Sequence, residues 1–226
     1  AASSLRLDDA LRDAAVRQPQ PLPLLQHALL EIYRQRAGGT LTFAAYRAIG
    51  GLEGALAQRA EQTFAGLSVA AQRQLPNVLR LMVMLTLAGD DALPVGRRIA
   101  WSELTEVPAR ELAQAFVEQR LFVAAGGADE PGVAAAHESL FRNWPRARDW
   151  VGENRRLLLA RARLAAAWRR WRDEGRPRDF LLPPGSQLDD ARQLLADAPP
   201  LDAGLREFVG ESVRRWRRQR RRGFVA

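Results

Sequence analysis

The side chains best suited to chemistry gather between Gly132 and Val151, in the stretch GVAAAHESLFRNWPRARDWV. Val133 to Ala136 is short and apolar, which predicts a buried strand that delivers His137 to the start of a helix. An imidazole at such a junction can hydrogen-bond a polar ligand, and its charge changes near neutral pH. A histidine satisfied within the core is the alternative, and the residue pattern leaves both open.

No arrangement of nucleophile, base and acid is visible in the chain. His137 has only Glu138 near it in the sequence, and neither GxSxG nor HExxH occurs. Cysteine is absent, and His27 and His137 are the two histidines, so thiolate and histidine-rich metal sites are excluded. The phosphate-binding pattern Gly-x-x-x-x-Gly-Lys-Ser/Thr is excluded as well, because there is no lysine. We expect no catalysis and no bound metal.

Composition bounds the class of protein. The 226 residues suffice for one large domain or two to three small ones, and a hydrophobic content of 47% supports real cores. The net charge of +8 comes entirely from arginine, a usage that reflects a GC-rich genome as well as chemistry. The N-terminus has no signal peptide, and no apolar run reaches about 18 residues. We expect a soluble, cytoplasmic protein, cut from a longer chain.

Hydrophobic spacing predicts a mainly α fold: a helical bundle plus a winged helix with a short β-hairpin, followed by a second helical domain. His27 lies beside an apolar helical stripe and is expected to be a partly buried structural residue. The elements that the pattern predicts are helices at 4–17, 24–36, 42–46, 52–64, 69–87, 108–119, 154–174, 188–196 and 201–216, a short strand at 96–100, and a hairpin of 121–125 with 133–136.

Three segments resemble one bacterial family. HESLFRNWPRARDW, residues 137–150, is similar to its HE-x-L-x-x-x-WP-x-x-x-x-W signature. PLPLLQHALLEIY at 21–33 and LTFAAYRAIGGLEGALAQRAEQTF at 41–64 match the same family in the same order. The family is the novel STAND NTPases, signal-transduction ATPases with numerous domains, which resemble the apoptosome and plant immune receptors in organisation.

The resemblance implies that this chain is the regulatory arm that follows the P-loop core. It implies a helical arm at 1–66, a winged helix at 67–150, and a helical domain rich in arginine and tryptophan at 151–226. ADP or ATP would bind only together with the missing nucleotide domain, and exchange of ADP for ATP would open the switch.

The resemblance implies that two residues contact the nucleotide. His137 would contact a phosphate of ADP and hold the switch closed. Pro23 matches the proline that packs on the adenine in a Gly-x-Pro segment, although Pro21 stands at the glycine position. A proline in the first turn of a helix is the alternative for Pro23.

The resemblance also implies partners: the chain's own N-terminal nucleotide domain, C-terminal sensor repeats of the β-propeller type, and further copies when the switch is active. The run Arg214–Arg222 holds seven arginines within nine residues. It is typical of the cytoplasmic flank of a membrane span, here one following Ala226, and would contact an anionic membrane surface. A solvated end and a nucleic-acid tail are the alternatives.

Two other functions stay open. A DNA-binding winged-helix regulator would read bases with residues 109–120, but Glu111 and Glu118 in this helix and Asp129 and Glu130 in the wing make it a poor DNA reader, and nucleic acid an unlikely partner. A helical scaffold would use the tryptophan-rich surface, and an exposed apolar patch within residues 155–216 would favour it. The predicted stripe of the long helix, expected to be core, consists of Leu157, Ala160, Leu164, Trp168 and Trp171.

Overall fold

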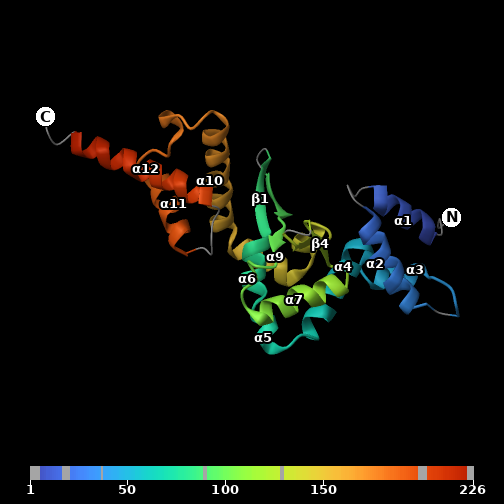
Figure 1. The fold of residues 1–226 in the computed structure, drawn as a ribbon. Coiled ribbons are helices and arrows are strands. Elements are labelled where there is room, and N and C mark those ends of the chain that lie inside the picture. Colours follow the sequence, from blue (N-terminus) through green and yellow to red (C-terminus); the bar gives the residue numbers. More distant parts are fainter. Residues whose placement is uncertain are drawn as a thin grey trace. The chain divides into compact units, whose positions relative to one another are not determined.

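The chain is mainly α-helical with two small antiparallel sheets, as a computed structural model shows (Figure 1). The structure describes residues 6–16, 21–36, 38–88, 91–127, 130–197 and 203–222. Two compact units divide the chain: residues 1–83 with 94–152, and residues 84–93 with 153–226. The finer division into three domains stays a prediction.

The first unit begins with four helices, α1 (Leu7–Val16), α2 (Pro21–Arg34), α3 (Phe43–Ala48) and α4 (Gly51–Ala65). Thr42 caps α3, since its hydroxyl accepts a hydrogen bond from the Ala45 amide at 3.1 Å. Helix α2 packs along α4.

The buried face of α2 agrees in part with the predicted one. The spacing predicted a stripe of Leu25, Ala28, Leu29 and Ile32, and Ala28 and Ile32 are buried. Leu25 is half-buried and Leu29 is 40% exposed, whereas Leu24 is fully buried. The packing of α2 against α4 therefore covers Leu24 and leaves Leu29 on the outer face.

The rest of this unit surrounds a three-stranded sheet. Its helices are α5 (Val69–Gln72), α6 (Leu75–Met82), α7 (Val107–Glu118), α8 (Ser139–Asn143) and α9 (Pro145–Glu153), and its strands are β3 (Ile99–Ala100), β4 (Phe122–Ala125) and β5 (Gly132–Ala135). The strand order is β3-β5-β4, all antiparallel, with Phe122 opposite Ala135 and Ile99 opposite Val133. The predicted hairpin is confirmed.

One predicted helix is wrong. The sequence pattern predicted a helix to Leu87, but α6 ends at Met82, and a hairpin of β1 (Val83–Ala88) and β2 (Asp91–Gly96) follows. The backbone turns extended at Val83, with φ −86° and ψ 131°. A fully apolar run fits a strand as well as a buried helix, and the β-branched Val83 and Thr86 favour the strand. Gly89 and Asp90, which connect the two strands, lie outside the described residues.

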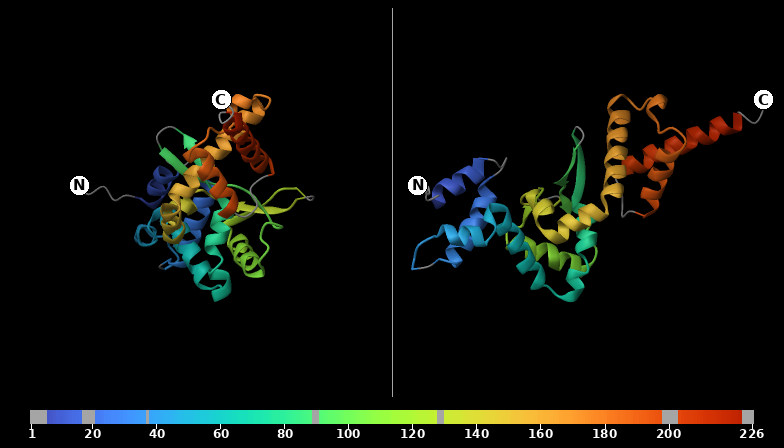
Figure 2. Two further views of the ribbon diagram at one scale, coloured as in Figure 1. Left: turned by 90° about the vertical axis from the view of Figure 1, so that its left-hand side faces the viewer. Right: turned by 180° about the vertical axis from the view of Figure 1, so that it is seen from behind.

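The second unit contains most of the β1–β2 hairpin, three helices and a short 3-10 helix (Figure 2). The helices are α10 (Arg155–Asp173), η1 (Arg178–Phe180), α11 (Ser186–Asp197) and α12 (Ala203–Arg222). Trp171 is 4% exposed and its ring centroid lies 5.2 Å from that of Phe208, so this tryptophan is core, as predicted. Leu157 was expected in the same core but is 36% exposed, whereas its neighbour Leu158 is buried. In the part of the chain that the structure describes, no helix is long and apolar enough to cross a membrane.

Candidate functional site

His137 lies between the end of β5 and the start of α8, where the sequence predicted a junction of strand and helix. Its side chain is buried, with 6% exposed. The Nδ1 atom accepts a hydrogen bond from the Ser139 amide at 3.0 Å. The imidazole therefore caps the first turn of α8, and a neutral ring carries its proton on Nε2.

Trp144 anchors the same motif to α4. Its indole is 1% exposed, and Nε1 donates to Oε2 of Glu61 at 2.9 Å. The ring packs edge-on against Phe64 at a centroid distance of 5.8 Å and against Phe116 at 5.5 Å. The Trp-Pro step at residues 144 and 145 is thus fixed by both an apolar pocket and one polar contact.

Arg146 holds the other side of the same carboxylate. Its Nε lies 2.9 Å from both oxygens of Glu61, and its Nη2 donates to Oε1 at 2.8 Å. The guanidinium also lies 4.4 Å above the centre of the Phe64 ring. The hydrogen bonds from Arg146, followed by that from Trp144, hold the pKa of Glu61 below its ordinary value. Glu61 therefore joins α4 to the segment of α8 and α9.

His27 forms a second link, between α2 and the end of α7. The ring is 6% exposed, and its Nε2 lies 3.2 Å from the carbonyl oxygen of Arg120, to which it donates. Burial lowers the pKa of His27 below its ordinary value, because the charged ring would lose its hydration. The structural role predicted for His27 is confirmed.

A buried carboxylate lies one helical turn further along α2. Glu31 is 4% exposed and accepts from Nη1 of Arg34 at 2.7 Å, with Nη1 of Arg59 at 3.8 Å. Arg59 also donates through Nη2 to Oε1 of Gln119. Charged and amide groups therefore fill the junction of α2, α4 and α7, where an apolar contact would be ordinary.

The sequence reading missed Glu31, Arg59 and Glu61. A signal existed for Glu31, which follows His27 by four residues and therefore shares the buried face of α2. Glu61 stands between the buried Ala60 and Phe64 of α4, a position that borders the core. Neither spacing predicts the distant residues that Glu31 and Glu61 contact, because those contacts depend on the fold.

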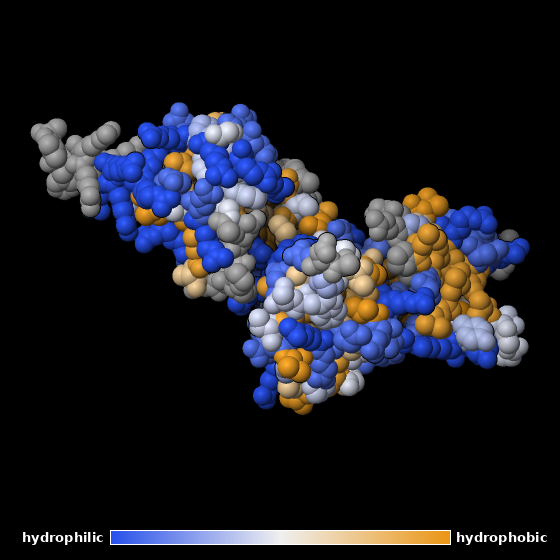
Figure 3. All heavy atoms as spheres, in the orientation of Figure 1, coloured by the Kyte–Doolittle hydropathy of each residue, from blue (hydrophilic) through white to orange (hydrophobic). Residues whose placement is uncertain are grey.

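The other predicted contact residue, Pro23, belongs to the first turn of α2, and its side chain lies outside the described atoms. The helix that contains it presents apolar side chains to solvent. Figure 3 shows hydrophobic atoms gathered over α1, α2 and α3. The exposed side chains there are Leu22 at 76%, Leu29 at 40%, Leu30 at 40%, Tyr33 at 53% and Leu41 at 37%.

Exposed apolar patches of this kind are characteristic of contact surfaces between domains or proteins. Across the described ranges, which omit a few short segments, no group of histidine, aspartate and glutamate residues is arranged to hold a metal ion.

Comparison with known proteins places the chain in a family. The family model described as Novel STAND NTPase 1 matches residues 2–179, which include both units' α-helices up to η1 and all the residues of the His137, Glu61 and His27 contacts. Neither the curated proteins nor the solved structures gave a match to the chain. The chain belongs to the Novel STAND NTPase 1 family.

Proposed function

We propose that this chain is the non-catalytic regulatory arm of a STAND-type ATPase switch. It senses whether ADP or ATP occupies the nucleotide domain and couples that domain to a C-terminal sensor region. The observation that carries the proposal is the held imidazole of His137, at the start of α8 within the family's signature. The ATP chemistry itself belongs to a P-loop domain, whose lysine this chain lacks.

The contacts of His137 define how it would sense a phosphate. Because Nδ1 is engaged with the Ser139 amide, the phosphate contact has to come from the Nε2 hydrogen. The hydrogen bond to the backbone already fixes the orientation of the ring. The ring therefore loses little conformational entropy on binding, which favours a directional contact with a phosphate oxygen. ADP that bridges the nucleotide domain and this arm then favours the closed state, and its replacement by ATP favours the open one.

Helix α2 supports the proposed contact between this arm and the nucleotide domain. Its outer face exposes Leu22, Leu29 and Leu30, a surface suited to cover by the preceding nucleotide domain. Pro23 lies on the same helix, one residue after Leu22. The contact with the domain and the contact of Pro23 with the adenine would therefore come from a single rigid element.

The alternative of a DNA-binding regulator receives less support from α7. Glu111 on this helix accepts hydrogen bonds from the amide and hydroxyl of Ser68, and Glu118 is exposed. Glu130 of the wing pairs with Arg98. Carboxylates on both surfaces that would face DNA repel phosphates.

The test is ADP binding by calorimetry on a protein in which the chain is joined to its P-loop domain. Wild type and His137→Ala are compared at equal folded fraction. Loss of a hydrogen bond to a charged group predicts weaker ADP binding by about 1–3 kcal/mol. ADP affinity equal to wild type, with lowered stability, would contradict the proposal and leave His137 a core residue.

A further inference from the structure

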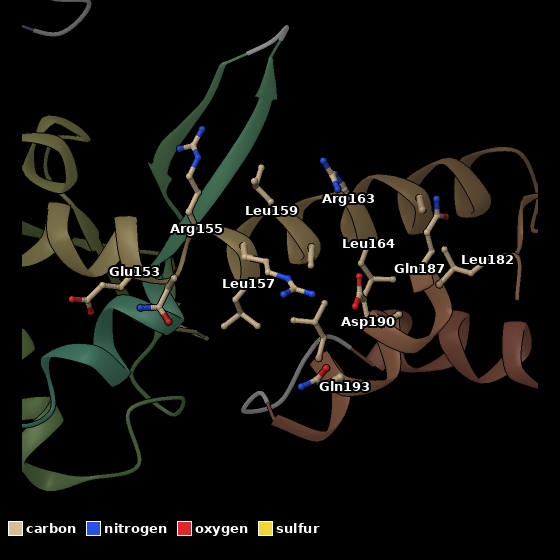
Figure 4. Close-up of a pocket in the computed structure, with 16 residues that line it drawn as sticks. Glu153, Arg155, Leu157, Leu159, Arg163, Leu164, Leu182, Gln187, Asp190 and Gln193 are labelled. Atoms are coloured by element: carbon tan, nitrogen blue, oxygen red, sulfur yellow. The ribbon is translucent and has the colours of Figure 1, made fainter. Parts of the chain in front are cut away.

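A long groove runs between α10 and α11 in the second unit (Figure 4). Its volume is about 890 Å³. All its lining residues fall between Glu153 and Leu194. The floor is apolar and is formed by Leu157, Ala160, Leu164, Leu182, Ala191 and Leu194.

Part of the apolar floor of this groove is open. Leu157 is 36% exposed, and Leu159 and Ala160 are half-buried. In Figure 4, Leu157, Leu164 and Asp190 lie in the space between α10 and α11. Leu164, Leu182, Ala191 and Leu194 are at most 9% exposed and belong to the core beneath, so a partner's apolar side chains would contact Leu157, Leu159 and Ala160.

The two sides of the groove differ in charge, since α11 supplies Asp190 with the amides Gln187 and Gln193, and Glu153 lies just before α10. Helix α10 supplies Arg155, Arg156 and Arg163, and no acidic residue occurs in α10 before Asp173. Arg155 donates to the carbonyl of Ala92 at 3.3 Å. In the described ranges no ion pair engages Arg156 or Arg163. The side formed by α10 is therefore cationic and lacks carboxylate partners.

The dimensions of the groove favour a helix as its occupant. The lining residues of α10 run from Arg155 to Ala167, which at 1.5 Å per residue is a length of about 18 Å. A helix satisfies its own backbone hydrogen bonds, so it can lie on an apolar floor without leaving polar groups unpaired. A drug-sized ligand is instead held in a cavity that encloses most of its surface.

We propose that this groove binds an amphipathic helix of a partner protein that carries carboxylates along one edge. Its apolar side chains lie on the leucine floor, and its carboxylates face Arg156 and Arg163. These arginines are seven residues apart, two helical turns or about 10.5 Å, so acidic residues at the same spacing on the partner match them. Most of α11's side of the groove follows residue 179 and so lies beyond the family match.

Two fluorescent peptides with the same leucine stripe test the proposal. One carries glutamate at the edge positions and the other lysine, and binding to the full chain is measured by fluorescence anisotropy. We expect the glutamate peptide to bind at least about tenfold more tightly. Arg156→Glu with Arg163→Glu should reverse this preference, and Leu157→Asp should weaken the binding of both peptides.

Arg217→Glu with Arg218→Glu is the matched control, because it changes the net charge equally at exposed positions of α12. The control should keep the preference and the affinity within about threefold. Circular dichroism confirms that each variant is folded. The proposal is overturned if the peptides bind equally, if neither binds, or if the control acts like the groove variant. It is also overturned if dodecanoate occupies the groove and excludes the glutamate peptide. None of these measurements involves ADP, so they are independent of the nucleotide proposal.

Discussion

At the scale of single residues, the family signature contains side chains with separate tasks. Trp144 and Arg146 both bind Glu61, and thereby attach the segment of α8 and α9 to α4. His137 uses Nδ1 to cap α8. The apolar spacing of the signature was readable from the sequence, but Glu61 stands 83 residues before Trp144 and 85 before Arg146. A contact over such a separation depends on the fold and has no local signal.

We expect Arg146→Lys to lower the free energy of unfolding by about 1 kcal/mol, because lysine cannot make the two-pronged contact with Glu61 or stack on Phe64. The expected loss in the free energy of unfolding is small because both charged partners are partly exposed. Arg148→Lys is the control, because Arg148 pairs only with its exposed neighbour Asp149. Urea denaturation measures both, and equal losses in the two variants would contradict the proposed attachment.

The buried ring of His27 predicts a pH dependence of stability. Burial lowers its pKa below the ordinary value of 6.5; the hydrogen bond to the Arg120 carbonyl and the charge of Glu31 oppose this shift, and the charges of Arg59 and Arg120 add to it. The unfolded chain then binds more protons than the folded one, so this contribution is lost as the pH falls below 6.5.

His27→Gln keeps a donor for the Arg120 carbonyl but does not titrate. The stability difference between wild type and this variant should therefore shrink on going from about pH 7 to about pH 5.5. His137 is the same in both proteins and serves as an internal control. Denaturation curves that stay parallel across this range would exclude the mechanism.

At the scale of elements, the starts of two helices carry a local marker, and the end of α6 does not. Thr42 and Ser68 cap α3 and α5, since their hydroxyl groups accept hydrogen bonds from the amides of Ala45 and Ala71. The switch from α6 to β1 at Val83 had no such marker. An apolar run that is not interrupted by polar residues has no periodicity that distinguishes a buried helix from a buried strand.

The turn between α3 and α4 depends on a glycine. A Cβ atom added at Gly54 would lie 2.2 Å from the carbonyl oxygen of Ile49, and a backbone oxygen cannot move aside without disturbing the turn. Gly54→Ala should therefore lower the free energy of unfolding by about 2 kcal/mol or more.

Gly152→Ala in α9 is the matched control, since nothing lies within 4 Å of its added Cβ. Alanine there should be neutral or stabilise the protein by up to about 1 kcal/mol. Thermal unfolding measures the two variants together. A Gly54→Ala protein as stable as the control would show that the turn adapts.

At the scale of the whole molecule, the mainly α class and the confirmed hairpin followed from hydrophobic spacing. The two packing corrections concern Leu29, which is 40% exposed beside the buried Ala28, and Leu157, which is 36% exposed beside the buried Leu158. Local spacing defines an apolar face to within about one residue, or 100° of rotation. Packing against the neighbouring helix then determines which side chains are buried. Both misplaced leucines lie on surfaces for which we propose partners.

The C-terminal part of α12 extends beyond α10 and α11 (Figure 2). Arg217, Arg218 and Arg220 are exposed there, and Trp216 is half-buried with Arg220 above its ring. We propose that the run Arg214–Arg222 contacts an anionic membrane surface.

Co-sedimentation with phosphatidylserine vesicles should therefore exceed that with phosphatidylcholine and should fall with added salt. Each arginine near the surface contributes about 1 kcal/mol, so Arg217→Glu with Arg218→Glu should weaken vesicle binding at least about tenfold. Arg156→Glu with Arg163→Glu is the control. Tighter binding to single-stranded DNA than to vesicles would favour a nucleic-acid tail instead.

The measurement that tests nucleotide sensing most directly compares His137→Asn with His137→Ala in the protein that carries the P-loop domain. The asparagine side chain can accept the Ser139 amide, as Nδ1 does, but cannot reach as far as Nε2. We predict that His137→Asn keeps near wild-type stability yet loses ADP affinity by about 1–3 kcal/mol, as His137→Ala does. Wild-type ADP affinity in a stable His137→Asn protein would contradict sensing by His137 and leave it the cap of α8.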